Sequence, residues 1–248
     1  MIEFKTALLF STVLLSIVVG TNSFGQSSQS DRNPYHLKLI QTATNYQNQV
    51  FENPEMEMVE LKNSIPDIKL DIRYATANNF TGKVIYGSPR AFARKPVVEA
   101  LRKIQDSLSI YNLGLKIYDS YRPYSATLRF FEVYPDTNFV ASPRSGSRHN
   151  RGCAVDLTLI DKNTGEEIPM PTAFDDFSER AHPEYPNLPE KVLANRKFLF
   201  GLFTHFGFNH YPSEWWHFDF NGWDKYPLMD LSFEELSKNQ YLSSIKTL

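Results

Sequence analysis

A single cysteine, Cys153, in a chain of 248 residues is the feature that most constrains how this protein can fold. Disulfide bonds need paired cysteines, and zinc fingers and ribbons need several thiolate ligands, so both kinds of small cross-linked scaffold are excluded. Stability must come from a hydrophobic core, for which 42% hydrophobic and 14% aromatic residues are sufficient. The sequence therefore predicts one globular domain, in which Cys153 is a buried thiol.

The charge balance argues against nucleic acid as a partner. The chain has 26 Lys and Arg residues against 28 Asp and Glu residues, a net charge of -2, and no long basic run. Nucleic-acid binding depends on Lys and Arg side chains that neutralise phosphates, so we expect no nucleic-acid partner.

Residues 1–25 have the layout of a secretory signal peptide. Lys5 precedes an apolar run from Ala7 to Val19, and small and polar residues follow the run. The run is shorter than the roughly 20 residues of a membrane-spanning helix, and no cysteine follows it that could carry a lipid. We therefore expect cleavage near Gly25 or Gln26, and export of a periplasmic or secreted protein with no stable membrane anchor.

The rest of the chain divides into a lead-in and one domain. Residues 26–55 are rich in Ser, Asn and Gln, which predicts a flexible lead-in, and residues 56–248 form the domain. Apolar spacing predicts strands over residues 63–74, 115–119, 153–159 and 215–220, a helix that Pro96 opens, and helices over 125–134 and 191–206. Because strands and helices alternate irregularly, we predict an α+β fold with an antiparallel or mixed central sheet flanked by helices.

Two segments concentrate side chains that can bind a metal or transfer protons: SRHNRGCAVD at residues 147–156 and EWWH at residues 214–217. His149 precedes a predicted strand that carries Asp156, and Glu214 and His217 begin another. If these strands are neighbours, two imidazoles and one carboxylate converge on one cation with a second carboxylate beside it. That arrangement is typical of a catalytic zinc site. Spacing alone leaves ordinary core and surface roles for these residues equally open.

The two segments resemble the D-alanyl-D-alanine dipeptidase family, of the VanX type, within the zinc D,D-peptidase group. Further blocks match the family in order along the chain, from about Val59 to Trp223: DIRYAT with Asn79-Phe80, YDSYRP at residues 118–123, and MPT with Phe174-Asp175. The resemblance implies that residues 56–248 are a catalytic domain. It also implies hydrolysis of the D-alanyl-D-alanine dipeptide to two D-alanines by a metal-activated water.

Carried over position by position, the resemblance implies one zinc ion per chain and a role for each residue of the site. The implied roles are zinc ligands at His149, Asp156 and His217, a catalytic base at Glu214, a transition-state residue at Arg122, and substrate-binding residues at Asp175, beside the substrate ammonium, and Ser147. Cys153 differs from the family pattern, in which a small or hydroxylated residue is expected after the glycine. We do not expect it to be a fourth zinc ligand.

Alternatives remain at several of these positions. Arg122 could be a structural arginine held in an ion pair. Asp119 is better suited to be a structural partner of a nearby donor than to be a catalyst. Because Asp176 lies next to Asp175, either could bind the substrate, and only the family pattern favours Asp175. At the level of function, one rival is a D,D-carboxypeptidase or endopeptidase that acts on peptidoglycan stem peptides. The other is a non-catalytic cell-wall binding protein, whose mark would be loss of the base or of the transition-state residue, yet both Glu214 and Arg122 are present.

Overall fold

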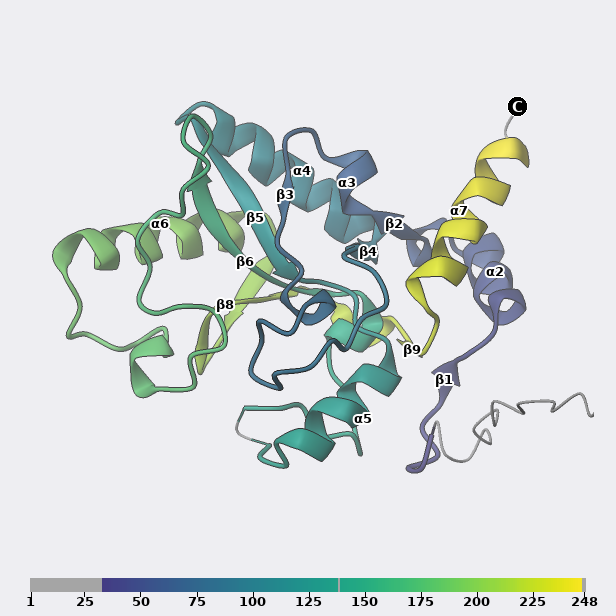
Figure 1. Ribbon diagram of the computed structural model, residues 1–248. Coiled ribbons are helices and arrows are strands. Elements are labelled where there is room, and N and C mark those ends of the chain that lie inside the picture. Colours follow the sequence, from purple (N-terminus) through teal and green to yellow (C-terminus); the bar gives the residue numbers. More distant parts are fainter. Residues whose placement is uncertain (1–32, 138, 247–248) are drawn as a thin grey trace, which may run out of the picture.

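The computed structural model describes residues 33–137 and 139–246, and its centre is a five-stranded mixed sheet (Figure 1). The strand order is β3-β5-β6-β8-β7, in which β3 runs parallel to β5 and the other neighbours are antiparallel. This confirms the predicted α+β fold with a mixed sheet. The strands are β3 (Lys69–Leu70), β5 (Leu113–Asp119), β6 (Ala154–Asp161), β7 (Phe208–Tyr211) and β8 (Glu214–Phe220).

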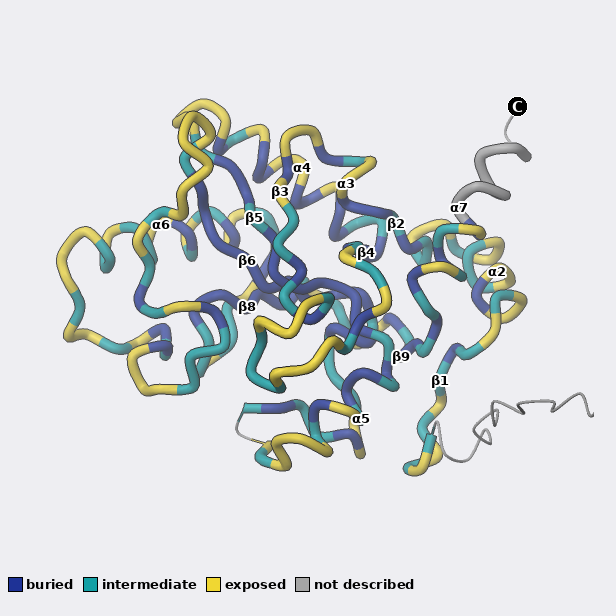
Figure 2. The backbone as a smooth tube through the Cα atoms, viewed as in Figure 1, coloured by how far each residue is buried: buried dark blue, intermediate teal, exposed yellow. Residues whose placement is uncertain are grey.

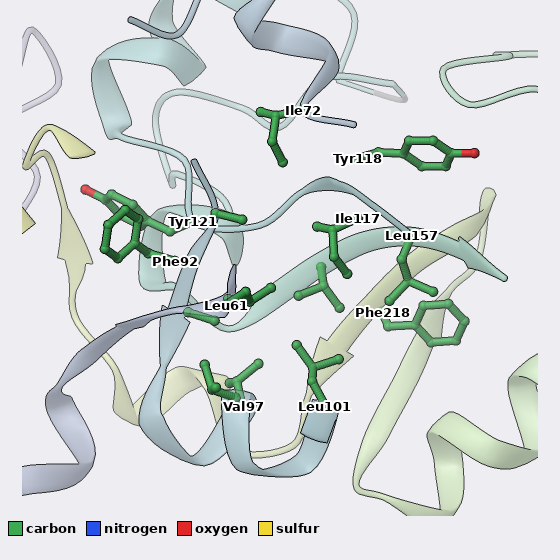
Figure 3. Packing of buried hydrophobic residues seen from close by; sticks show 14 of the residues in the cluster. Leu61, Ile72, Phe92, Val97, Leu101, Ile117, Tyr118, Tyr121, Leu157 and Phe218 are labelled. Carbon is green, nitrogen blue, oxygen red and sulfur yellow. The ribbon is translucent and has the colours of Figure 1, made fainter. Parts of the chain in front are cut away.

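Helices α4 (Lys95–Ser109) and α6 (Glu190–His205) pack on one face of this sheet. Pro96 lies in the first turn of α4, where its missing N–H costs no hydrogen bond. Val97 and Leu101 of α4 lie beneath Ile117 and Leu157 of the sheet (Figure 3). Their burial removes apolar surface from water and fixes the helix against β5 and β6. Figure 2 shows these central strands buried along most of their length.

The site lies on the opposite face of the sheet. Side chains alternate along a strand, so Asp156 points away from the helix-covered face that carries Leu157. Asp156 is the register partner of His217, and directly opposed residues in an antiparallel pair share a face. The fold therefore places a carboxylate and an imidazole side by side under loops and α5 (Tyr124–Val133) rather than against the large helices.

Two small sheets join distant parts of the chain. Strand β1 (Leu39–Ile40) runs parallel to β9 (Leu228–Met229), and β2 (Met58–Glu60) runs antiparallel to β4 (Phe92–Arg94). Helix α2 (Ala43–Glu52) lies beside α7 (Phe233–Lys246), as Figure 1 shows. Both ends of the described chain are thus tied to one side of the domain.

The N-terminal part of the structure differs from the predicted flexible lead-in. Helix α2 occupies residues 43–52, the Thr42 side chain caps it by accepting a hydrogen bond from the Asn45 N–H, and buried Tyr46 accepts one from Met58 N–H at 2.7 Å. The polar composition of this segment therefore did not indicate helix α2, which buries the Tyr46 side chain. The predicted signal peptide lies outside the described residues, and no described helix is long and apolar enough to cross a membrane.

The predicted strand over residues 63–74 is wrong for most of its length. Residues 61–64 form the short helix α3 (Leu61–Ser64), only Lys69 and Leu70 pair as a strand, and Arg73–Ala75 is a 3-10 turn. Asp67, directly after Pro66, has a φ of 60°, which breaks extended structure. The other predicted strands and helices are confirmed, with ends shifted by at most two residues.

Candidate active site

The three predicted zinc ligands come together near the N-terminal end of the central strand β6. Asp156 and His217 are opposed in the sheet, and His149 lies in a 3-10 turn (His149–Arg151) just before β6. All three side chains are buried, and their potential ligand atoms lie within 4.8 Å of one another. This cluster of His149, Asp156 and His217 is called the ligand triad below.

A glycine makes this turn possible. Gly152 ends the turn with a φ of 70°, a conformation that favours glycine, and a Cβ there would lie 2.7 Å from the Met58 Cε. The chain can therefore pass from His149 into β6 within a few residues, and this brings the imidazole over Asp156.

Hydrogen bonds on the far side of each imidazole fix which nitrogen faces the cluster. His149 Nδ1 lies 2.6 Å from the Ser120 carbonyl oxygen, so Nδ1–H donates and Nε2 carries the free lone pair. His217 Nε2 lies 2.9 Å from Asp219 Oδ1, so Nδ1 is the free nitrogen in the neutral ring. Such outer partners are typical of metal-binding histidines.

When both imidazoles are neutral, the atoms that face one another are all electron-pair donors. His149 Nε2 lies 3.2 Å from His217 Nδ1, and Asp156 Oδ1 lies 3.0 Å from the same Nδ1 without adopting hydrogen-bond geometry. Although burial alone would lower it, the carboxylates of Asp219 and Asp156 raise the pKa of His217 well above its usual value. The cluster therefore favours a positive charge, and two imidazoles with one carboxylate are a donor set that fits zinc.

Asp219 was not predicted from the sequence, and its contact with His217 gives a testable consequence. Asp219→Asn is expected to weaken zinc affinity by about 10- to 100-fold, because the amide no longer enforces the Nδ1-free form of His217. Competition with a chromophoric chelator measures this. Asp224→Asn, at an exposed position nearby, is the matched control and should leave zinc affinity unchanged; equal affinity in the Asp219 variant would contradict the assignment.

Glu214 is at the first position of β8 and lines the same cavity as the ligand triad. Its Oε2 lies 3.7 Å from His217 Nδ1, so the carboxyl is beside the triad and outside the set of mutually close ligand atoms. Burial raises the pKa of Glu214 to about 7. A carboxyl with such a pKa can both accept and return a proton near neutral pH.

Arg122 lies between β5 and α5, with its guanidinium held on several sides. Nε and Nη2 donate to Asp119 Oδ2 at 3.0 and 2.8 Å, and the group lies over the Phe130 ring at 4.6 Å. Nη2 is also 4.0 Å from Asp156 Oδ2. Asp119 is thus the structural partner that the sequence suggested, and the arginine it fixes still reaches the edge of the ligand triad.

Asp175 lines the cavity, whereas its neighbour Asp176 accepts a hydrogen bond from the Ser178 N–H in a turn. Asp175 has a φ of 61°, accepts a hydrogen bond from the Tyr74 hydroxyl at 3.0 Å, and leaves Oδ2 buried without a partner. Burial raises the pKa of Asp175 to about 8. An unpartnered buried carboxyl of this kind is suited to receive a cationic group.

The loop before the triad is braced by buried polar contacts. Ser147, which lines the cavity, accepts a hydrogen bond from the Asn150 N–H at 3.2 Å, and Asn150 Nδ2 donates to the Arg122 carbonyl at 2.9 Å. Cys153 is fully buried, as predicted, and burial raises the pKa of its thiol to about 12. A thiol in this state has no tendency to ligate a metal.

All seven predicted site residues line one cavity of about 390 Å³. A volume of this size is within the range of small-molecule sites and is ample for a dipeptide. The structure thus brings the predicted residues together, while their roles in binding and catalysis stay predictions. Sequence reasoning missed Asp219 and the Ser120 carbonyl, which orient the two imidazoles. It allowed Tyr74 a place in the pocket or in a strand alone, and the structure shows its hydroxyl in contact with Asp175 in the cavity.

Comparison with known proteins identifies the family. The family model described as D-ala-D-ala dipeptidase matches residues 54–235. The chain belongs to this D-Ala-D-Ala dipeptidase family. A D-alanyl-D-alanine dipeptidase of Escherichia coli (strain K12) is 38% identical over 173 residues, covering 70% of this chain and 89% of that protein.

More distant members and structures extend the comparison. A D-alanyl-D-alanine dipeptidase of Enterococcus faecium is 30% identical to this family member, over 66% of this chain and 91% of that protein. Among solved structures, that of the LdcB LD-carboxypeptidase has 19% sequence identity and a TM-score of 0.39, and covers 74% of this chain and 78% of its own.

Proposed function

We propose that this protein is a zinc-dependent dipeptidase that hydrolyses D-alanyl-D-alanine to two D-alanines. Membership of the D-Ala-D-Ala dipeptidase family supports the reaction class. One observation carries the proposal: the ligand triad, Glu214 and the unpartnered carboxyl of Asp175 line the same cavity. The triad would hold the metal, Glu214 would transfer the proton, and Asp175 would bind one end of the substrate.

His149, Asp156 and His217 would hold the zinc ion. When bound, zinc polarises a peptide carbonyl and makes water nucleophilic at neutral pH. Glu214 accepts the proton of the attacking water and then delivers it to the leaving amine, because burial sets its pKa at about 7. One carboxylate thereby serves both halves of the hydrolysis.

Arg122 stabilises the negative charge that develops on the carbonyl oxygen. Asp119 and the Phe130 ring hold its guanidinium in place before substrate binds, so little reorganisation is needed during the reaction. An arginine suits this role because it stays charged even when it is buried.

Asp175 binds the substrate ammonium. The partnerless Oδ2 gains a donor on binding, and the positive charge favours the ionised carboxylate despite burial. An internal peptide bond of a long stem peptide presents no ammonium there, so the residue favours a free dipeptide.

Asp175→Asn is expected to lower kcat/KM for D-Ala-D-Ala by about 100-fold, because the charge that pairs with the ammonium is lost. Asn tolerates the left-handed backbone at this position, and burial already favours the uncharged carboxyl, so the melting temperature should not fall. Steady-state kinetics and thermal unfolding measure the two effects. Unchanged kcat/KM would remove Asp175 from substrate binding.

The test of the function itself compares two substrates. Zinc-loaded protein should release D-alanine from D-Ala-D-Ala and leave a stem pentapeptide that ends in D-Ala-D-Ala intact. Cleavage of the pentapeptide would favour the carboxypeptidase or endopeptidase rival. Bound zinc with no turnover of either substrate would favour the cell-wall binding rival.

We also propose that the protein is exported and acts in the periplasm or outside the cell. Residues 1–25 support this location through their signal-peptide layout. An exported dipeptidase would scavenge dipeptides released from the cell wall, since the cytoplasmic precursor pool is out of its reach. Fractionation that found the protein and its activity confined to the cytosol, with residues 1–25 intact, would overturn this.

A further inference from the structure

Arg148 lines the cavity immediately before the ligand His149, and the mechanism above gives it no task. Its guanidinium lies over two aromatic rings, 4.8 Å from the centre of Trp223 and 5.5 Å from that of Tyr211. Its Nε lies 3.3 Å from Asp219 Oδ2. A guanidinium stacked and paired in this way is held in one orientation.

Among the residues that the structure describes, the two Nη groups of Arg148 form no hydrogen bond, and about a third (35%) of the side chain is exposed. The other cavity arginines are already engaged. Arg122 donates through Nε and Nη2 to Asp119, and Arg151 donates through Nη1 to the Tyr226 carbonyl. Within the described chain, Arg148 therefore keeps the four N–H donors of its two Nη groups available for a ligand.

The position of Arg148 complements that of Asp175. Asp175 is linked to the Arg122 side of the ligand triad, because its partner Tyr74 lies under the Arg122 guanidinium. Arg148 is linked to the His217 side, because its partner Asp219 contacts His217 Nε2 and Tyr211 packs against the His217 ring. The cavity thus has a carboxyl group and a guanidinium on different sides of the triad.

A free dipeptide carries the matching charges: an ammonium at one end and a carboxylate at the other. We propose that Arg148 binds the carboxylate of the C-terminal residue of the dipeptide through its Nη donors. This rests on the proposed function, and it adds a second determinant of substrate length. With Asp175 at the ammonium and Arg148 at the carboxylate, the peptide bond between them lies at the ligand triad, and a substrate extended at either end loses one of the two ion pairs.

The experiment removes the charge from the enzyme and from the substrate separately. The wild-type protein should cleave D-Ala-D-Ala about 100-fold more efficiently than D-Ala-D-Ala amide, which lacks the carboxylate. Arg148→Gln should lower kcat/KM for the dipeptide by about the same factor and change that for the amide less than about threefold. In a Glu214→Gln background, calorimetry should show weaker dipeptide binding when Arg148→Gln is added.

Controls separate this inference from the function on which it rests. Arg144→Gln removes a positive charge from an exposed site in the same loop and should leave both substrates unaffected. Zinc content, measured for every variant, should stay at the wild-type level. An equal loss on dipeptide and amide in Arg148→Gln would overturn carboxylate binding while the dipeptidase function stood. If the wild-type protein cleaved neither substrate, the proposed function itself would fail.

Discussion

Replacing Glu214 by Gln is expected to lower kcat for D-Ala-D-Ala by about 1,000-fold while the protein keeps its zinc. The amide has nearly the shape of the carboxyl but cannot accept a proton from water. Because burial raises the pKa of Glu214 to about 7, an uncharged group is tolerated at this position and the fold should be preserved. Steady-state kinetics and metal analysis of the same preparation measure both parts of the prediction.

Glu184→Gln is the matched control for this variant, since it makes the same chemical change at an exposed position. It should retain wild-type kcat and zinc content. Loss of zinc from the Glu214 variant would show that this carboxylate is a ligand, and the assignment of the proton-transfer role would then have to be abandoned.

Replacing His217 by Ala should abolish both zinc binding and activity. His217 is one of the three proposed ligands, and its loss would leave His149 and Asp156, which cannot hold the ion alone. Activity should fall by at least about 1,000-fold, because water activation and carbonyl polarisation disappear together. Equilibrium dialysis against zinc, followed by metal analysis, gives the direct measurement.

His205→Ala provides the comparison, because this histidine is exposed at the end of α6. It should bind zinc and turn over substrate as the wild-type protein does. The Glu214→Gln and His217→Ala variants also test each other, because activity should be lost with zinc present in the first and with zinc absent in the second. Retention of stoichiometric zinc by His217→Ala would overturn the proposed ligand triad.

Much of the fold could be predicted because the apolar pattern of its longer elements follows their burial. Pro96 and the helical spacing after it mark α4, and the buried run from Ala154 marks β6. The same reasoning failed over residues 63–74. Ile65, Ile68 and Ile72 are buried there, but only Lys69 and Leu70 belong to a strand. Apolar spacing reports burial, and burial does not require strand pairing.

The part of the site that side chains form could be predicted from the sequence. The part to which the backbone contributes could not. Spacing along two strands predicted that Asp156 and His217 could meet, and the register pairs them directly. The His217-x-Asp219 spacing places both residues on one strand face and could have predicted the imidazole partner. The Ser120 carbonyl that orients His149 has no sequence signal, because every residue carries a carbonyl group.

The pairing of β1 with β9 connects the N-terminal part of the described chain to the loop that leads to His149. Leu228 of β9 pairs with Leu39 and also packs so closely on Gly146 that a Cβ there would lie 2.8 Å from its Cδ2. The loop that leads to His149 is therefore supported by a strand that lies far from it along the chain. Through this strand, β1 can influence the position of the loop although Leu39 and Ile40 line no part of the described cavity.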